Sequence, residues 1–307
     1  MSDAAIDRAG TVLHRPLWFR FLDHHVAVAS GFFLLVMALA ATAAPLVEGW
    51  MGQDATLVDL FNRFAPPDAN HPLGTDEAGR DVLLRLLYGG RVSLFVGLVT
   101  AIFAAIIGTT VGLFAGYYGG GIDRALMRLT DGVISLPLLP LLIVLAAVDL
   151  SKLPLPESWV QAEAVSLYRI VIIIALVGWT TVARLVRGAT LSVRAREYVL
   201  AAEALGARPW RIMVTHILPN IASPIVVSTT LSAGTIILLE SVLSFLGLGI
   251  QPPMPSWGNM LTNAQELIWQ APELAVYPGL LIFVSVIAFN FLGDGLQDAL
   301  DPRSAPR

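Results

Sequence analysis

Residues 92–118 read VSLFVGLVTAIFAAIIGTTVGLFAGYY and include no charged side chain. A membrane-spanning α-helix needs ~20 mostly apolar residues, and this run is long enough to provide them. Backbone polar groups cannot stay unpaired in lipid, and the sequence lacks the alternating pattern of an outer-membrane strand. The stretch therefore predicts a helical membrane protein.

The composition of the whole chain supports this prediction. Of its 307 residues, 56% are hydrophobic and 14% are charged, whereas soluble domains have about 45–50% apolar and about 25% charged residues. A net charge of −4 and the lack of a basic tract argue against nucleic acid as a partner. The single lysine, Lys152, follows no glycine-rich turn, so the chain has no P-loop for binding nucleotide phosphates.

The pattern of apolar runs predicts an all-α polytopic membrane protein with six transmembrane helices. The six runs are Val26–Val47, Val92–Tyr118, Gly132–Val148, Val165–Ala183, Ile221–Leu239 and Leu274–Gly293. Ahead of the second run, Gly79–Ser93 has the pattern of an amphipathic helix, with Arg80, Asp81 and Arg85 on its polar side. We expect that helix to lie at the outer membrane interface.

The positions of the arginines predict the orientation of the chain. If the N-terminus is inside, 13 of the 19 basic residues fall on the cytoplasmic side, as the positive-inside rule requires. Both termini are therefore expected in the cytoplasm. The predicted organisation is a cytoplasmic tail (1–25), a first span (26–47), an external loop with the amphipathic helix (48–91), the main transmembrane domain (92–298) and a cytoplasmic tail (299–307).

The first span also raises the question of a signal peptide. The small residues Ala41, Thr42 and Ala43 fit a cleavage site after an apolar stretch. The run Val26–Val47 has 22 residues, which is longer than the ~7–15 residues of a signal core. We therefore expect an uncleaved membrane anchor.

Four residues within the spans or at their edge are candidates for a translocation pathway or a helix interface: Gly108, Gly112, Glu240 and Asn290. The two glycines and Gly116 are spaced by four, so they share a helix face that another helix can approach closely. A carboxylate at the edge of a span is costly and often functional. Glu240 fits a pathway, a helix pair or an interfacial position equally well, whereas Asn290 favours an interhelical hydrogen bond.

We expect no catalytic or metal-binding residues. The segment HPLGTDEAGRD (71–81) contains a histidine and three acids, but their spacing matches no metal-binding loop. We interpret it as a solvated external loop. The sequence also lacks a Ser/His/Asp arrangement, a pair of acids placed for hydrolysis and an H-E-x-x-H motif.

One polar segment, EYVLAAEALGARPWRIMVTHILPN (197–220), separates the fourth and fifth spans. Its first part contains good helix formers, and Gly206 is suited to end that helix. Pro209 is suited to begin a second short helix, and Pro219 is expected to end it before the fifth span. Two short helices joined by a glycine turn predict a docking element at the cytoplasmic surface.

This segment resembles the cytoplasmic "EAA" loop of binding-protein-dependent ABC importer permeases. Leu200 occupies the position of the family's first glutamate. Six positions match the motif: Ala201, Ala202, Gly206, Ile217, Leu218 and Pro219. Glu203 and Ala207 belong to the same segment. The resemblance implies that the loop 187–220 contains a coupling helix that binds a separate ATPase subunit.

Three further stretches resemble the second permease subunit of dipeptide, oligopeptide and nickel importers. They are HPLGTDEAGRDVLLRLLYGGRVSL (71–94), LSFLGLGIQPPMPSWGNML (243–261) and FNFLGDGLQDALDPR (289–303). The resemblance implies a MetI-like ABC permease fold in the bacterial inner membrane. It also implies a non-catalytic subunit that forms half of a pathway for di- or oligopeptides.

The partners implied by the family are a second homologous permease, two ATPase subunits and an extracytoplasmic peptide-binding protein, all assembled at the lipid bilayer. This chain would bind no cofactor, because ATP and Mg²⁺ belong to the ATPases. Nickel chelates, glutathione and sugars remain alternative cargoes. A secondary transporter is a rival interpretation, but it would be expected to have charges in several spans.

Overall fold

The computed structural model describes residues 17–152, 156, 158 and 164–300, and the terminal parts of both predicted tails lie outside this range. Helices dominate the described residues, and Thr75 and Asp81 form an isolated bridge. The longer helices are α1 (Leu17–Leu22), α2 (His25–Thr42), α3 (Ala44–Met51), α4 (Val82–Tyr118), α5 (Gly120–Ile134), α6 (Leu138–Ala146), α8 (Val165–Arg194), α9 (Glu197–Ala204), α11 (Ala222–Phe245) and α13 (Glu273–Leu300). The shorter elements are Leu60–Asn62, Leu150–Lys152, α10 (Pro209–Arg211), the π-helix Ile212–Ile217, Leu218–Ile221, Asn259–Leu261 and α12 (Ala264–Leu267).

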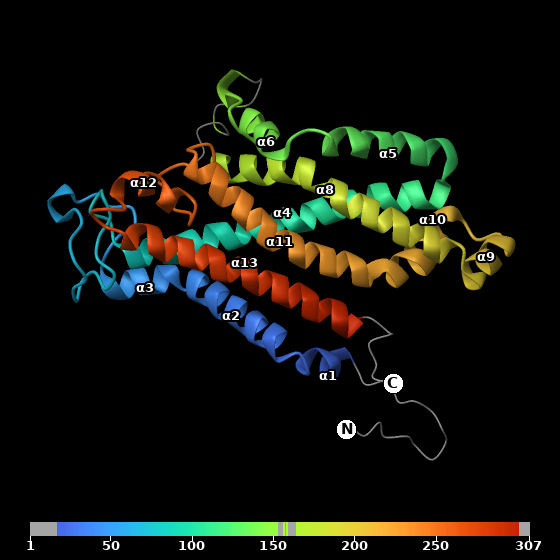
Figure 1. The fold of residues 1–307 in the computed structure, drawn as a ribbon, viewed down its shortest axis with the longest axis horizontal. Helices are drawn as coiled ribbons and strands as arrows, with labels where there is room; N and C mark the ends of the chain where they lie inside the picture. The colour runs from blue at the N-terminus through green and yellow to red at the C-terminus, as the bar shows by residue number, and fades with distance from the viewer. Residues whose placement is uncertain (1–16, 153–155, 157, 159–163, 301–307) are drawn as a thin grey trace, which may run out of the picture.

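Five helical segments are long and apolar enough to cross a membrane, and a sixth span results if the bent pair α5–α6 counts as one. The five are α2, α4, α8, α13 and the continuous stretch Pro209–Phe245. Figure 1 shows them as an elongated bundle, with α9 and α10 at one end and the loop between α3 and α4 at the other. Among the described residues, the architecture agrees with the predicted all-helical membrane protein.

Helices α4 and α8 form the most closely packed pair in the bundle. A Cβ added to Gly108 would lie 2.5 Å from the carbonyl oxygen of Trp179, and one added to Gly112 would lie 2.5 Å from that of Ala183. A Cβ added to Gly116 would lie 2.6 Å from the Cβ of Thr190. The three glycines therefore place the backbone of α4 directly against α8.

The remaining spans pack around this pair. Helix α11 lies against both α4 and α13, and α2 lies against α13. Gly97 of α4 faces Ile237 of α11, while Gly293 of α13 faces Leu231. The described ends of the chain lie side by side, because the Arg20 side chain donates to the carbonyl oxygen of Asp298 over 3.3 Å.

Helix α4 begins earlier than the sequence predicts. The expected interfacial helix Gly79–Ser93 is instead the first part of one 37-residue helix. The Asp81 side chain caps this helix by accepting from the Leu84 N–H over 2.8 Å. Arg85, predicted on a polar outer face, is buried, because the loop before α4 folds over it.

The predicted third span, Gly132–Val148, differs from the structure. It corresponds to the end of α5 and all of α6, and these two helices are bent by 83° at a short break. Pro137 is extended, with ψ of 117°. A proline disfavours helical geometry in the residue before it and supplies no N–H, so α5 ends before Leu136.

Pro219 does not end a helix, contrary to the sequence prediction. The backbone continues from α10 through the π-helix and a 3₁₀ turn into α11. A proline removes one hydrogen bond and crowds the carbonyl four residues earlier, and a π-turn is a known way to absorb such a defect. The side-chain amide of Asn220 donates to the His216 carbonyl oxygen over 2.7 Å.

Candidate functional site

The polar segment between α8 and α11 forms a short helix closed by a glycine. The Gly206 N–H donates to the Glu203 carbonyl over 2.9 Å, and the Ala207 N–H donates to the Ala202 carbonyl over 3.0 Å. Gly206 has φ of +80°. This pair of bonds is a Schellman motif, which needs a left-handed residue at the position of Gly206. Helix α9 therefore ends where the sequence predicts a glycine stop.

The segment is fixed to the bundle by its apolar side. Val199 of α9 packs into a cluster with Ile212, Met213 and Ile217, and all four side chains are buried. Residues of α4 and α8, including Leu113 and Val186, complete this cluster. Ala202, Ala207 and Leu218 are half-buried against it, whereas Pro219 is exposed. The two short helices are thus held on a packed base.

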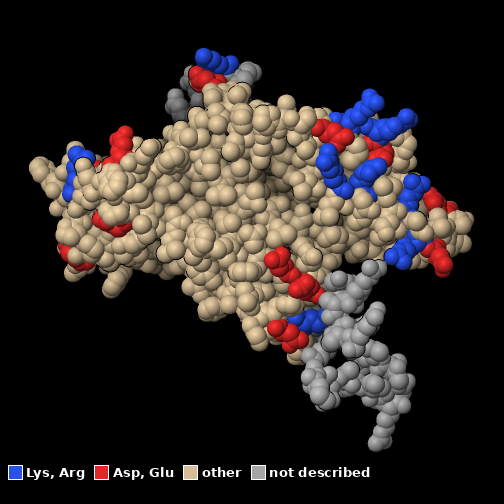
Figure 2. All heavy atoms as spheres, in the orientation of Figure 1, with Lys and Arg blue, Asp and Glu red and all other residues tan. Residues whose placement is uncertain are grey.

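Several large apolar side chains of the segment are exposed, and three of them are more than half exposed. Leu200 is 52% exposed, Leu205 is 88% exposed and Trp210 is 65% exposed. We call these three residues the α9 patch. Ala201, Glu203 and Ala204 between them are also exposed. Figure 2 shows charged side chains gathered around this end of the molecule, while the broad middle surface is uncharged. Apolar groups exposed among charges are typical of a protein-binding surface.

Two ion pairs near this end join α5 to α8. Arg187 binds Asp123 with both Nε and Nη2, at 2.5 and 2.6 Å. Arg184 Nη2 lies 2.5 Å from Asp131 Oδ1. These pairs were missed from the sequence. The available signal was the amphipathic pattern of residues 120–134, whose acids face arginines at the end of the fourth span.

Glu240 is fully buried where α11 meets α4. Its carboxylate accepts hydrogen bonds from Ser244 Oγ at 2.7 Å and Ser93 Oγ at 3.2 Å. Ser93 Oγ in turn accepts from the N–H of Trp257, also at 3.2 Å. The Trp257 ring packs on Gly90, where an added Cβ would lie 2.9 Å from it. Glu240 therefore helps attach the loop after α11 to α4.

The other sequence candidates in the spans lie at different kinds of position. Gly108 and Gly112 contact α8, as described above. Asn290 is exposed, and its amide donates to the Val286 carbonyl of its own helix over 3.0 Å. The four candidates are therefore not brought together into one site.

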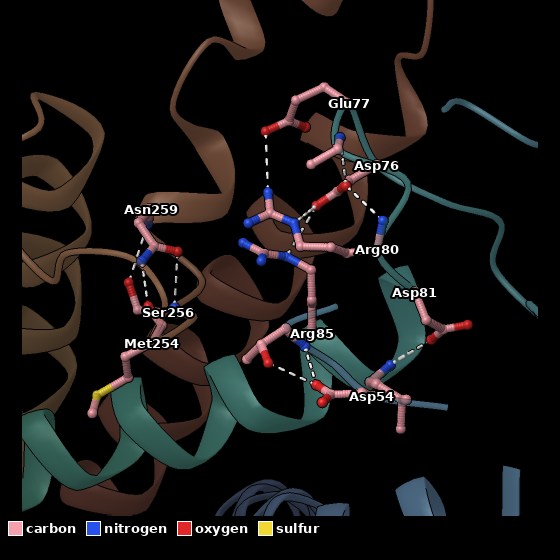
Figure 3. Close-up of polar contacts among 12 residues, drawn as sticks. Asp54, Asp76, Glu77, Arg80, Asp81, Arg85, Met254, Ser256 and Asn259 are labelled. Atoms are coloured by element: carbon pink, nitrogen blue, oxygen red, sulfur yellow. Dashed lines mark hydrogen bonds and ion pairs between the residues drawn. The ribbon is translucent and has the colours of Figure 1, made fainter. Parts of the chain in front are cut away.

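The loop predicted to be solvated, residues 71–81, is instead a packed polar cap. Asp76 Oδ2 lies 2.8 Å from Arg80 Nε and 3.2 Å from Arg85 Nε, and Figure 3 shows Asp76 reached by both arginines. His71 Nδ1 lies 3.0 Å from Asp81 Oδ2. Within the described residues, no group of three or more His, Cys, Asp or Glu side chains is arranged to hold a metal ion.

A second loop packs beside this cap. The Asn259 side chain accepts from the Ser256 N–H at 2.9 Å and donates to the Met254 carbonyl at 2.8 Å (Figure 3). Trp257 Nε1 donates to the Leu86 carbonyl at 3.0 Å. These contacts hold the loop after α11 against the start of α4. In the sequence, the tract SWGNML was the only sign of this loop.

Comparison with known protein families identifies the family to which this chain belongs. Residues 108–306 match the family described as "Binding-protein-dependent transport system inner membrane component". The chain belongs to this family. Residues 15–67 match the "N-terminal TM domain of oligopeptide transport permease C". The permease is thus a non-catalytic, multi-pass inner-membrane subunit of a binding-protein-dependent ABC importer, as the resemblance in the sequence implied.

Individual relatives cover nearly the whole permease. The dipeptide transport system permease protein DppC of Alkalihalophilus pseudofirmus is 43% identical over 94% of this chain and 90% of its own. The glutathione transport system permease protein GsiD of Pectobacterium atrosepticum is 40% identical over 94% of this chain and 91% of its own.

A solved structure of the MetNI methionine ABC transporter, described as inward facing, shares the fold of the permease. It superposes with a TM-score of 0.56 at 20% identity, covering 70% of this chain and 96% of that one. The expected MetI-like permease fold is therefore confirmed.

Proposed function

We propose that this permease forms half of the translocation pathway of an importer for di- and oligopeptides, with its α9 patch bound to a separate ATPase subunit. A second homologous permease would supply the other half, two ATPases the energy, and an extracytoplasmic peptide-binding protein the cargo. The α9 end would face the cytoplasm together with both termini. The observation that carries this proposal is the exposed α9 patch on a rigid base.

The patch suits docking of a protein. Leu200, Leu205 and Trp210 are exposed among charged residues, and burying them on a partner would remove apolar area from water at roughly 25 cal/mol per Å². The exposed alanines Ala201 and Ala204 allow that partner to approach the helix backbone. The chain contains no P-loop, which fits a division of labour in which a separate subunit hydrolyses ATP.

The connection from α10 to α11 suits transmission of motion. The helical path runs without a break from Pro209 to Phe245, and the far end of α11 holds Glu240 and the loop that contains Trp257. A displacement of α10 by a docked ATPase would therefore move the whole of α11. We assign Gly108, Gly112 and Glu240 to helix interfaces, while the exposed Asn290 remains available to a partner or the pathway.

The cargo proposal rests on the relatives. DppC is named for dipeptides, GsiD for glutathione and the N-terminal family for oligopeptides. All three cargoes are short chains of amino acids joined by amide bonds, so we propose a short peptide. Glutathione is then the main alternative. A binding experiment with the purified binding protein would distinguish the two by measuring calorimetric affinity for di-alanine and for glutathione.

The docking proposal is tested by Gly206→Arg, with Gly52→Arg as a matched control. Both glycines have positive φ and open space where a Cβ would lie, so both substitutions introduce the same backbone strain. Gly206→Arg places its new side chain at the α9 patch, whereas Gly52 follows α3 at the opposite end. We expect Gly206→Arg to lower ATP-dependent uptake and ATPase co-purification by about tenfold, equivalent to about 1.4 kcal/mol of docking free energy.

The control variant Gly52→Arg should retain both ATP-dependent uptake and co-purification with the ATPase. Normal uptake by Gly206→Arg would contradict the docking assignment. Uptake that persists after the ATPases are disabled would contradict the importer itself and favour a secondary transporter.

A further inference from the structure

Helix α2 packs against α13 at the edge of the bundle (Figure 1). The two helices touch where small residues meet, because a Cβ added to Gly295 would clash with the Cβ of Ala27. Beside this contact, the surface is hollowed into a groove of about 490 Å³. This volume falls within the ~300–1,000 Å³ of small-molecule sites. We call the hollow the α2–α13 groove.

The lining of the groove is apolar. Ala29 and Ala288 have short side chains that leave the space, and Phe33 and Phe291 also line it. None of its described lining residues is Asp, Glu, Lys or Arg. Both helices are long and apolar enough to cross a membrane, and Phe291 is exposed. The groove is therefore open to the bilayer, whose hydrocarbon chains match its lining.

One polar side chain is buried in the groove without a partner. Ser30 lines the groove and is 8% exposed, and its hydroxyl has no hydrogen-bond partner among the described residues. A polar group buried without a hydrogen bond is costly. Ser30 is five residues after His25, or about 7.5 Å further along α2. An ester carbonyl of a glycerolipid, just below the headgroup, would accept a hydrogen bond there.

The end of the groove at the start of α2 favours an anion. His25 lines this end, and the apolar run 26–47 begins directly after it. His24, the residue before α2, does not cap the helix with its side chain. The first N–H groups of a helix have no partner within the helix and attract negative charge. A phosphate group would therefore be stabilised beside His25.

An acidic side chain lies next to the same end on α13. Asp294 follows Phe291 by three residues and Ile287 by seven, so it shares a side of the helix with these two lining residues. Asp294 is exposed and forms no ion pair within the described part of the chain. The next acid, Asp298, lies 3.7 Å from the His24 imidazole. Asp294 is thus the carboxylate available to a cation at this end.

We propose that the α2–α13 groove binds one molecule of phosphatidylethanolamine. An acyl chain would lie in the groove, the phosphate at the start of α2 and the ammonium group at Asp294. A primary ammonium donates charge-assisted hydrogen bonds to a carboxylate, whereas the trimethylated group of phosphatidylcholine has no N–H. An anionic headgroup would place a second negative charge beside Asp294.

The length of the groove agrees with one lipid leaflet. The helix from His25 to Phe33 measures about 12 Å, which is less than half of the ~30 Å hydrocarbon core. The lipid would fill the space beside the contact of Ala27 with Gly295 and hold α2 against the rest of the bundle. This site is separate from the α9 patch, and it depends on neither the cargo nor the ATPase.

The groove is tested by filling it with a large side chain. Ala29→Trp fills the groove, and Val36→Trp is the matched control, because Val36 is exposed, lies seven residues further along the same face and does not line the groove. Each complex, with all its subunits, is stripped of lipid in detergent and titrated with phosphatidylethanolamine. Native mass spectrometry then counts the bound lipids. We expect Ala29→Trp to bind one lipid fewer per permease chain than Val36→Trp.

The headgroup assignment is tested with Asp294→Asn. The unsubstituted complex should bind phosphatidylethanolamine at least about tenfold more tightly than phosphatidylcholine at this site, because only the former donates to the carboxylate. Asp294→Asn should bring the two affinities to within about threefold of each other. Because Asp294 is exposed, this substitution disturbs no packing and remains informative if Ala29→Trp does not fold.

Equal lipid counts for the two tryptophan variants would overturn the inference. A folded Ala29→Trp chain that no longer retains the partner permease, while Val36→Trp retains it, would also overturn it, because the groove would then be a protein interface. Equal affinities of the unsubstituted complex for the two lipids would show that Asp294 does not bind the headgroup.

Discussion

Gly112 determines how closely two spans approach each other. A Cβ at this position would lie 2.5 Å from the Ala183 carbonyl oxygen and 2.8 Å from Val186 Cβ, so the clash involves the backbone of α8. Because no flexible side chain can move aside, a single methyl group would push α4 and α8 apart. Gly112 thus permits the close approach of α4 and α8 because it has a hydrogen atom in place of a side chain.

We expect Gly112→Ala to destabilise the permease by ~1–3 kcal/mol through overpacking. Gly178→Ala is the matched control on α8, since its Cβ would meet Ala104 Cβ at an ordinary 3.7 Å. The measurement is the thermal unfolding midpoint of the purified complex in detergent. Equal shifts for the two variants would show that close contact at Gly112 does not limit the packing.

At the scale of the element, α5 is held to α8 by side chains that contribute little to burial. Thr130 is buried, but most of α5 is exposed. The two-point contact between Arg187 and Asp123 fixes its beginning, and the Arg184–Asp131 pair fixes its end. Planar, bidentate pairs of arginine and carboxylate restrict geometry more than single contacts do.

We expect Arg187→Asp to loosen α5 and destabilise the complex by about 1.5–3 kcal/mol, because it removes charged hydrogen bonds and places two carboxylates together. Asp123→Arg in the same chain should restore part of that loss. The thermal midpoints of both singles and the double variant measure the coupling. If the double variant is no more stable than the summed effects of the two single variants predict, Arg187 and Asp123 do not interact directly.

At the scale of the whole molecule, the two ends of the bundle differ in chemistry. The α9 end combines arginines with the α9 patch, and the opposite end is closed by the packed loops around Asp76 and Trp257. Such asymmetry fits a protein that meets an ATPase on one side and a binding protein on the other.

The proposed orientation is tested with Gly121→Cys and Phe61→Cys. Gly121, at the start of α5, has open space around it, and Phe61 is fully exposed in the loop before α4. An impermeant maleimide added to spheroplasts should label Phe61→Cys and leave Gly121→Cys unlabelled, with the reverse result in inverted vesicles. Labelling of Gly121→Cys from outside would reverse the assigned topology.

Much of the molecule could be predicted from local sequence. The charge-free run 92–118, the glycine spacing at 108, 112 and 116, and the stop at Gly206 each depend on residues that are neighbours in the chain. Length, periodicity and backbone freedom act over one helix, so a single sequence is enough to recognise them. The membrane class, the short helix closed by Gly206 and the glycine face of α4 were therefore available without coordinates.

Other features were decided only by tertiary structure. Arg85 had the pattern of an exposed residue, and Asp76 from a folded loop made its burial tolerable. Pro219 had the pattern of a helix stop, and the π-helix before it allowed α11 to continue. Residues 132–148 had the pattern of one span, and the structure instead divides them between α5 and α6, which are bent by 83°. In each case, the outcome depends on contact with a distant segment or on a change of backbone geometry. Neither can be predicted from the residues next to the position in the sequence.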